Sequence, residues 1–192
     1  MKYLKYFKES NNIQAELNRQ APLLKLENNA DGDLINTIKS LMGSGTILEI
    51  SCGNGADANE LSKSGYSITA TENNQQYVDN ANQKINCIKH DTKNKFPFSD
   101  KSFDMTFSRL GLHYFSKEEL VKIFQDISRI TKNFLVFTVK LVNNIQTGKI
   151  MFDKKTWEDL VEDDFEILSS ESKTGILYGD ECDWLEIIAK VK

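Results

Sequence analysis

Cysteine and proline are scarce in this sequence, and each shortage argues against a class of structure. The three cysteines (Cys52, Cys87 and Cys182) are an odd number and show no C-x-x-C spacing. This usage argues against a disulfide framework or a structural zinc site, and it favours a reducing compartment such as the cytoplasm. The two prolines, Pro22 and Pro97, interrupt no periodic segment, so the helices and strands predicted below are free of proline breaks.

Long apolar runs and an excess of positive charge are also missing. No run approaches the length of a membrane span, and the N-terminal sequence MKYLKYFKES lacks the apolar region of a signal peptide. We therefore expect a cytoplasmic protein without a membrane partner. The 24 Lys and Arg against 28 Asp and Glu give a net charge of −4, which argues against a nucleic-acid partner unless a basic groove is local.

The chain has the length and composition of one globular domain. Its 192 residues are 40% hydrophobic and 27% charged, which suffices for a full core. We expect residues 1–192 to form a single domain. Residues 1–32 are its least regular part, and their scattered aromatic side chains fit either a lid over a ligand site or a packed N-terminal helix.

From residue 33 onward the hydrophobic pattern alternates between strands and helices. Strands are predicted at 46–50, 66–72, 85–91, 102–108, 134–140, 165–176 and 182–192, and helices at 34–42, 56–64, 73–83, 117–130 and 154–162. Repeated strand–helix alternation predicts a parallel α/β sheet, and the two closing strands without a helix between them predict an antiparallel edge. The fold class is therefore a doubly wound α/β sheet with a terminal hairpin.

Helix ends carry local signals of their own. Ser116 and Glu119 have the spacing of a capping box, and Asp153 precedes the last predicted helix as an N-cap. Gly43 follows the first predicted helix, where a C-terminal cap is expected.

The turn after the first predicted strand has two interpretations. Gly53 to Ala58 reads as G-x-G-x-x-A, the dinucleotide fingerprint, whereas residues 49–55 read as E-x-S-C-G-x-G, close to the nucleoside-binding turn of methyltransferases. Glycine spacing shows only that backbone approaches a ligand. The turn alone therefore does not identify the ligand.

Polar residues follow each of the next strands as well. Glu72 follows the second strand, about twenty residues after the turn, where a carboxylate can accept hydrogen bonds from a ribose diol. Asp91 follows the third strand and Arg109 follows the fourth. Ligands bind at the carboxyl ends of the strands in open α/β sheets, so we expect these residues to form one site.

Four segments together resemble the class I S-adenosylmethionine-dependent methyltransferases: ILEISCGNG, TATEN, IKHD and FPFSDKSFDMTFSRLGLHYF. The resemblance covers residues 33–192 and is nearest to the small tellurite-resistance type. It implies a Rossmann-like, mostly parallel seven-stranded sheet with helices on both faces, and S-adenosyl-L-methionine as cofactor. A dinucleotide dehydrogenase has no reason to carry the last segment, so the NAD(P) oxidoreductase interpretation ranks last.

The resemblance also assigns residues to the site. The cofactor-binding candidates are Glu49, Ser51, Cys52, Gly53, Gly55, Glu72, Asn73, Asp91, Thr92 and Ser108. The catalytic candidates are Arg109 and His113, near the sulfonium and the mouth for the acceptor. No metal is expected, because His90 and Asp91 have no further ligand at a suitable spacing.

Several of these candidates also have an ordinary structural interpretation. Asp91 can cap its own turn, Arg109 can form an ion pair, His113 can hold a loop by a hydrogen bond, and Cys52 can be a small packing residue. Glu49 lies inside an apolar strand, where it requires a ligand or a backbone N–H group as partner.

The sequence departs from the family in two places. Ser51 stands where the family has glycine, and T-K-N replaces the Pro-Gly-Gly turn before the fifth strand, where we expect Asn133 to take a left-handed conformation.

The sequence thus predicts a methyltransferase acting on a small-molecule acceptor. Two alternatives stay open: methylation of RNA or protein, and a non-catalytic cofactor-binding or scaffold subunit. The sequence identifies neither the acceptor nor the oligomeric state.

Overall fold

The computed structural model describes residues 29–141, 152–177 and 180–192. The helices and strands follow the chain in this order: α3 (Gly32–Leu41), β1 (Thr46–Ile50), α4 (Ala56–Lys63), β2 (Ser67–Glu72), α5 (Gln75–Ala81), β3 (Asn86–Lys89), β4 (Phe103–Arg109), a 3₁₀ turn (Leu112–Tyr114), α6 (Lys117–Ile130), β5 (Thr131–Lys140), α7 (Lys154–Glu162), β6 (Phe165–Leu177) and β7 (Asp180–Val191).

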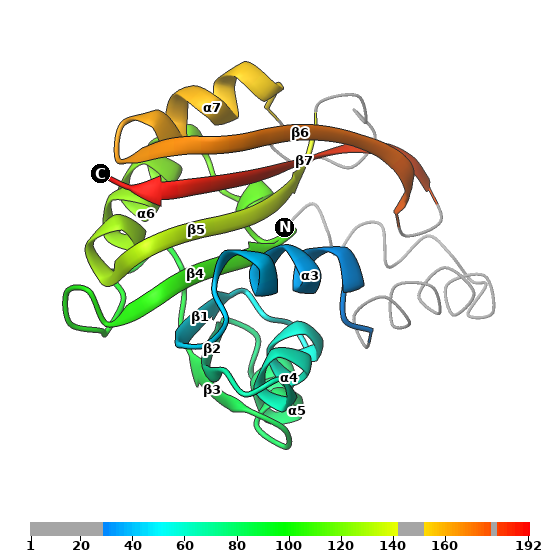
Figure 1. The fold of residues 1–192 in the computed structure, drawn as a ribbon, viewed down its shortest axis with the longest axis vertical. Coiled ribbons are helices and arrows are strands. Elements are labelled where there is room, and N and C mark those ends of the chain that lie inside the picture. Colours follow the sequence, from blue (N-terminus) through cyan, green and yellow to red (C-terminus); the bar gives the residue numbers. More distant parts are fainter. Residues whose placement is uncertain (1–28, 142–151, 178–179) are drawn as a thin grey trace, which may run out of the picture.

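All seven of these strands form one sheet (Figure 1), in the order β3-β2-β1-β4-β5-β7-β6. Strands β1 to β5 pair in parallel, whereas β7 pairs antiparallel with β5 and with β6. Strand order reverses between β1 and β4, which are neighbours in space but not in sequence. The predicted doubly wound sheet with an antiparallel C-terminal hairpin is confirmed.

Alternate residues of the central strands bury two separate cores. On one face, Ile47, Phe107 and Val136 pack with α3 and α4. On the other, Leu135 and Phe137 pack with α6 and α7, in a cluster that includes the fully buried Trp157. Period-two alternation along a strand covered on both faces explains this division.

Side chains that the sequence marked as caps begin two of the helices. Ser116 and Glu119 form the expected capping box at the start of α6, and the Asp153 carboxylate accepts from the Thr156 N–H at 2.8 Å at the start of α7. Asp31 caps α3 in the same way. These bonds satisfy N–H groups that the first turn of a helix leaves without intrahelical partners.

Two predicted turn conformations are wrong. Helix α3 ends at Leu41 with Met42 extended (φ −152°), and Gly43 has no positive φ. Asn133 lies within β5 and has no positive φ either, because Thr131 is already extended directly after α6 and its hydroxyl bonds that of Thr106 on β4 at 2.7 Å. The helix therefore passes into the strand without the glycine turn of the family.

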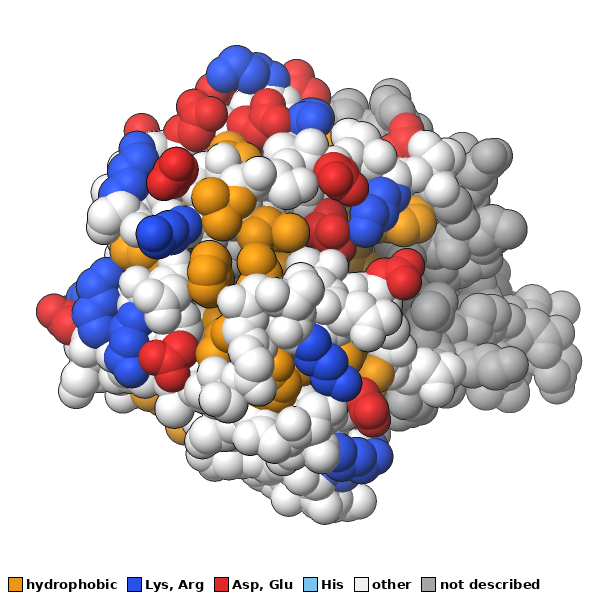
Figure 2. Space-filling view, in the orientation of Figure 1, with side chains coloured by type: hydrophobic (Ala, Val, Ile, Leu, Met, Phe, Trp, Pro, Cys, Tyr) orange, Lys and Arg blue, Asp and Glu red, His pale blue; other side chains and the backbone are white. Residues whose placement is uncertain are grey.

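One face of the molecule shows exposed hydrophobic side chains between charged groups (Figure 2). Leu168 is 48% exposed and lies at the irregularity where the pairing of β6 with β7 shifts register. The segment 1–32, for which a lid and a packed N-terminal helix are both open, lies largely in residues 1–28, outside the described residues. Among the described helices, none is long and apolar enough to span a bilayer.

Candidate functional site

The turn between β1 and α4 is held in a left-handed backbone conformation. Ser51, Gly53 and Gly55 have φ values of 58°, 53° and 70°. A Cβ atom at Gly53 would meet nothing within 4 Å, so this side of the turn is open, whereas one at Gly55 would lie 2.9 Å from Ile85. Gly53 therefore leaves bare backbone on this side of the turn, and Gly55 permits close packing against the chain after α5. Ser51 adopts a positive φ, which explains why the family has glycine at this position.

Glu72 joins this turn to the end of β2. One carboxylate oxygen accepts from the Gly53 N–H at 3.0 Å, and the other accepts from the Asn73 and Asn74 N–H groups at 2.8 and 2.9 Å. Three backbone donors therefore hold one half-buried carboxylate beside the open side of the turn.

Glu49 lies on β1 below the turn and is 2% exposed. Its carboxylate accepts from the Ala58 N–H at 3.1 Å, in the first turn of α4. Burial, and next the neighbouring Asp57 charge, raise the pKa of Glu49 well above its usual range. The backbone partner expected for this residue is present, and it places a carboxyl group at the N-terminus of the helix.

Asp57 and Arg109 form a buried ion pair across the site. The guanidinium Nε lies 2.6 Å from the Asp57 carboxylate, which also accepts from the Asp31 N–H at 2.7 Å. Arg109 donates in addition to the Asn29 carbonyl at 3.2 Å. Burial raises the pKa of Asp57, and Arg109 opposes that shift. These contacts join β4 and α4 to the segment before α3.

Sequence reasoning missed Asp57. The available signal was an acidic residue in the first turn of a helix that already had a carboxylate, Glu49, directed at its N-terminus. Two carboxyl groups at one helix start call for a cation nearby, and Arg109 was the basic residue at the end of the adjacent strand.

The segment after β4 closes against the β1 turn. The buried Ser108 hydroxyl donates to the Ile50 carbonyl at 3.0 Å, and Leu110 has a φ of 56°. A Cβ atom at Gly111 would lie 2.7 Å from both the Ser108 Oγ and the Ser51 Cβ. Gly111 is therefore a second residue that sequence reasoning missed; its signal was a glycine just after a strand of the site.

His113 lies in the 3₁₀ turn that follows and is 1% exposed. Its ring centroid lies 4.5 Å from that of Tyr114, whose side chain is 58% exposed. A catalytic role for His113 or Arg109 stays a prediction.

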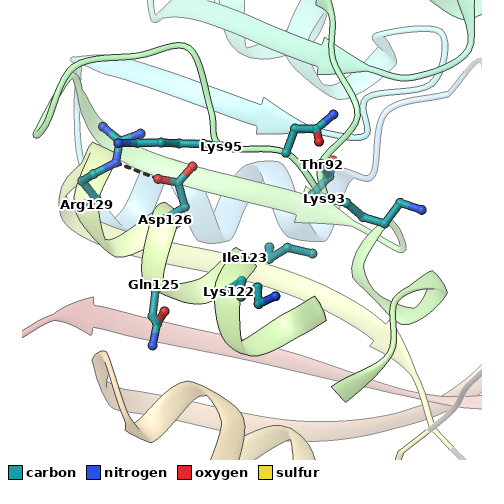
Figure 3. Close-up of a pocket in the computed structure, with 9 residues that line it drawn as sticks. Thr92, Lys93, Lys95, Lys122, Ile123, Gln125, Asp126 and Arg129 are labelled. Carbon is teal, nitrogen blue, oxygen red and sulfur yellow. Dashed lines mark hydrogen bonds and ion pairs between the residues drawn. The ribbon is translucent and has the colours of Figure 1, made fainter. Parts of the chain in front are cut away.

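Asp91 and Thr92 follow β3. The Asp91 carboxylate accepts from the Lys93 N–H at 3.1 Å, so it stabilises the turn of its own loop. Thr92 is 5% exposed and lines a pocket of about 420 Å³ between this loop and α6 (Figure 3). The other lining residues are Lys93, Asn94, Lys95, Lys122, Ile123, Gln125, Asp126 and Arg129. Arg129 and Asp126 pair with each other at 2.6 Å, and both also bond the backbone at Phe96.

Cys52 is 8% exposed, and its sulfur lies 3.6 Å from that of the buried Cys87 on β3. Within residues 29–141, 152–177 and 180–192, no group of three or more His, Cys, Asp and Glu residues is placed to hold a metal ion.

Comparison with known proteins places this geometry in a family context. Residues 47–133 match a family model described as a methyltransferase domain. A search of curated proteins finds no match to the chain.

Solved structures share the fold at low sequence identity. An S-adenosylmethionine-dependent methyltransferase from Methanosarcina mazei is 20% identical, with a TM-score of 0.72 over 85% of this chain and 98% of its own. TehB from Haemophilus influenzae is 16% identical, with a TM-score of 0.73 over 84% of this chain and 62% of its own. The [4+2]-cyclase SpnF is 17% identical, with a TM-score of 0.73 over 93% of this chain and 94% of its own.

These matches agree with the resemblance seen in the sequence, including the similarity to the tellurite-resistance type. The matching domain spans the β1 turn, Glu72 and the end of β4, and it implies S-adenosylmethionine as the cofactor. The chain therefore has the fold of the class I S-adenosylmethionine-dependent methyltransferases, with a methyltransferase domain matched from β1 into β5.

Proposed function

We propose that this chain transfers a methyl group from S-adenosylmethionine to a small-molecule acceptor, with the cofactor bound at the β1 turn. The observation that carries the proposal is the Glu49 carboxyl group at the N-terminus of α4. A dinucleotide places its pyrophosphate at that position in a Rossmann site. Glu49 already accepts from the Ala58 N–H group, so that donor is not available to a phosphate and the turn is unsuited to a dinucleotide.

Charge around the turn favours a cationic ligand. The Glu72 carboxylate accepts from the Gly53 N–H of the turn and Glu49 lies below it, whereas Arg109 pairs with Asp57. S-adenosylmethionine carries a sulfonium and an ammonium group against a single carboxylate. We therefore assign its methionine part to the open side of the turn at Ser51, Cys52, Gly53 and Gly55, above Glu49.

Glu72 is assigned to the ribose. A carboxylate offers about four acceptor sites, and backbone N–H groups use three of them in Glu72. One ribose hydroxyl can bind at the remaining site, and a second requires one backbone donor to be exchanged. Asn73 lies beside this carboxylate, and Asp91 and Thr92 at the end of the adjacent strand are assigned to the adenine side.

The bound cofactor supplies an activated methyl group, so the chain has to align the acceptor and exclude water. Ser108 shapes the floor of the site through its bond to the Ile50 carbonyl. Arg109, held by Asp57, positions the end of β4 and the segment at Asn29. A soft acceptor atom such as sulfur, selenium or tellurium needs little base catalysis. An oxygen or nitrogen acceptor would use His113 as base.

Binding calorimetry tests the cofactor assignment. We expect S-adenosylhomocysteine to bind and NAD not to bind. Glu72→Gln removes a charge-assisted hydrogen bond worth roughly 1.5–3 kcal/mol, which weakens binding by about 10- to 150-fold. Glu60→Gln is the matched control, because the Glu60 side chain on α4 is 47% exposed and lies 3.9 Å from the Lys63 ammonium group. Binding of NAD alone, or equal affinity in the two variants, would overturn the assignment.

Transfer is tested separately from binding. With methyl-labelled cofactor and a fractionated cell extract, we expect label in the small-molecule fraction rather than in RNA or protein. The shared fold does not decide this point, since the similar SpnF is a cyclase. Cofactor binding with no transfer to any fraction would favour a non-catalytic subunit, and label in RNA or protein would overturn the acceptor class.

A further inference from the structure

Two thiols lie in contact beside the β1 turn. Cys52 is the second residue of that turn, and Cys87 lies on β3, two strands away in the sheet. Their sulfur atoms are 3.6 Å apart, and neither cysteine forms a disulfide. The pair packs with Ala70 of β2 and with Val78 and Ala81 of α5. A disulfide bond measures about 2.05 Å, so the two sulfurs need to approach by only about 1.5 Å to bond.

The backbone around Cys52 is part of the site described above. The Cys52 N–H donates to the Thr71 carbonyl at 3.1 Å, and the next residue, Gly53, donates to Glu72 at 3.0 Å. Ser51 and Gly53, on either side of Cys52, both have positive φ. A displacement of Cys52 toward β3 therefore changes the turn and its bond to Glu72 together.

We propose that Cys52 and Cys87 form a reversible thiol–disulfide site, and that the disulfide draws the β1 turn toward β3 and weakens cofactor binding. The effect on cofactor binding rests on the proposed function; formation of the disulfide does not.

The oxidant is a small hydroperoxide, and the reaction balances in two steps. The Cys87 thiolate attacks one peroxide oxygen, the O–O bond breaks, and hydroxide leaves as Cys87 becomes a sulfenic acid. The Cys52 sulfur then attacks the Cys87 sulfur, the S–O bond breaks, and water leaves. Overall, two thiols lose two electrons and two protons, and one peroxide becomes two waters.

The environment of the pair favours this order of events. A hydrogen bond from Cys52 lowers the pKa of Cys87 below that of an ordinary thiol, whereas the same bond and burial raise the pKa of Cys52. The thiolate is the form that reacts, so Cys87 is the attacking residue and Cys52 the resolving one. Cys87 and Cys52 are 5% and 8% exposed, so we expect a molecule of peroxide size to reach them more readily than a larger disulfide oxidant.

Disulfide formation is tested in the full chain carrying Cys182→Ser, which removes the third cysteine. Treatment with hydrogen peroxide should reduce the number of free thiols from two to none, and reducing agent should restore both. Peptide mapping under non-reducing conditions should recover a crosslink between residues 52 and 87. Independent over-oxidation of the two cysteines without that crosslink would overturn the proposal.

The functional half compares S-adenosylhomocysteine affinity in the reduced and oxidised forms. We expect the oxidised protein to bind at least tenfold more weakly, with recovery on reduction. Cys182→Ser with Cys87→Ser is the matched control: it cannot form the bond, so its affinity should not change with peroxide. Equal affinity of the reduced and oxidised proteins for S-adenosylhomocysteine would overturn the proposed effect of the disulfide on cofactor binding. Failure of the reduced protein to bind at all contradicts the proposed function instead, and the crosslink assay is then still decisive for the dithiol.

Discussion

At the scale of single residues, Glu49 has the least ordinary environment in the site. Its carboxyl group is buried beside Asp57, and its raised pKa means that the folded protein holds a proton there more tightly than the unfolded chain does. The stability contributed by that proton is fully present below the ordinary pKa of a glutamate and is lost as the pH rises through the raised value.

Glu49→Gln should prevent this loss of stability at higher pH. A glutamine amide stays neutral, and its oxygen can still accept from the Ala58 N–H. We expect the variant without cofactor to be more stable than the parent at pH 7–8, by on the order of 1 kcal/mol or a few degrees in Tm. The advantage should shrink toward pH 5. Thermal melts across this pH range check it, and a Tm difference that does not change with pH would contradict it.

Gly111 makes a second prediction at this scale. An alanine there places its Cβ 2.7 Å from Ser51 and Ser108, so the chain after β4 must move away from the β1 turn. We expect Gly111→Ala to destabilise the fold by about 1–3 kcal/mol and to weaken cofactor binding. Gly43→Ala is the matched control, because its Cβ meets nothing within 4 Å and its φ is not positive. Equal urea midpoints for the two variants would show that the close approach is unimportant.

These residues also mark how far sequence reasoning reached. Glu49 was predicted because a charged residue inside an apolar strand is costly without a partner. Glu72 was predicted because it follows the second strand, about twenty residues after the glycine turn. Gly111 and Asp57 were missed because their importance arises from contacts between segments far apart in the sequence: β4 with the β1 turn, and α4 with Arg109. A single sequence states residue types and spacing, whereas these contacts depend on the packed sheet.

At the scale of elements, α6 is tied to the loop before β4 through Arg129. Its guanidinium donates to the Phe96 and Phe98 carbonyls at 3.1 and 2.7 Å and pairs with Asp100 and Asp126. A lysine has one nitrogen and cannot reach all four groups in this geometry.

We therefore expect Arg129→Lys to destabilise the protein by about 1–3 kcal/mol, as measured by urea unfolding. Lys122→Ala tests the specificity of this effect, since Lys122 lines the same pocket from the same helix (Figure 3) and its loss should change stability by less than about 0.5 kcal/mol. A small effect of both changes would show that the loop is held by its aromatic contacts instead.

The elements themselves were predictable, because strand and helix periodicities depend on neighbouring residues. Capping side chains at Ser116 and Asp153 were predictable for the same reason. The two failures, Gly43 and Asn133, occur where a helix leads into a strand, and tertiary pairing sets the backbone there. At Thr131, the bond to Thr106 on β4 extends the chain at once and leaves no room for a glycine turn.

At the scale of the whole molecule, the seven-stranded sheet joins the β1 turn to the C-terminal hairpin. Strand β5 pairs with β4 on one side and with β7 on the other, and the core between α6, α7 and the sheet contains residues of β1, β4, β5, β6 and β7. The small cluster around Cys52 and Cys87 adds only β2, β3 and α5. Since β1 also contributes to the larger core, we expect the protein to unfold as one cooperative unit.

A ligand that binds only the folded state should then stabilise every strand equally. At S-adenosylhomocysteine concentrations 100 times Kd, the expected gain is about 2.7 kcal/mol, or roughly 5–11 °C in Tm for a chain of this size. Calorimetry should show one transition that moves as a whole, and fluorescence of Trp157 and Trp184, in α7 and β7, should follow the same midpoint as far-ultraviolet circular dichroism. A second transition whose midpoint does not change with ligand would mean that the C-terminal hairpin and α7 fold independently. The single-domain prediction would then be wrong.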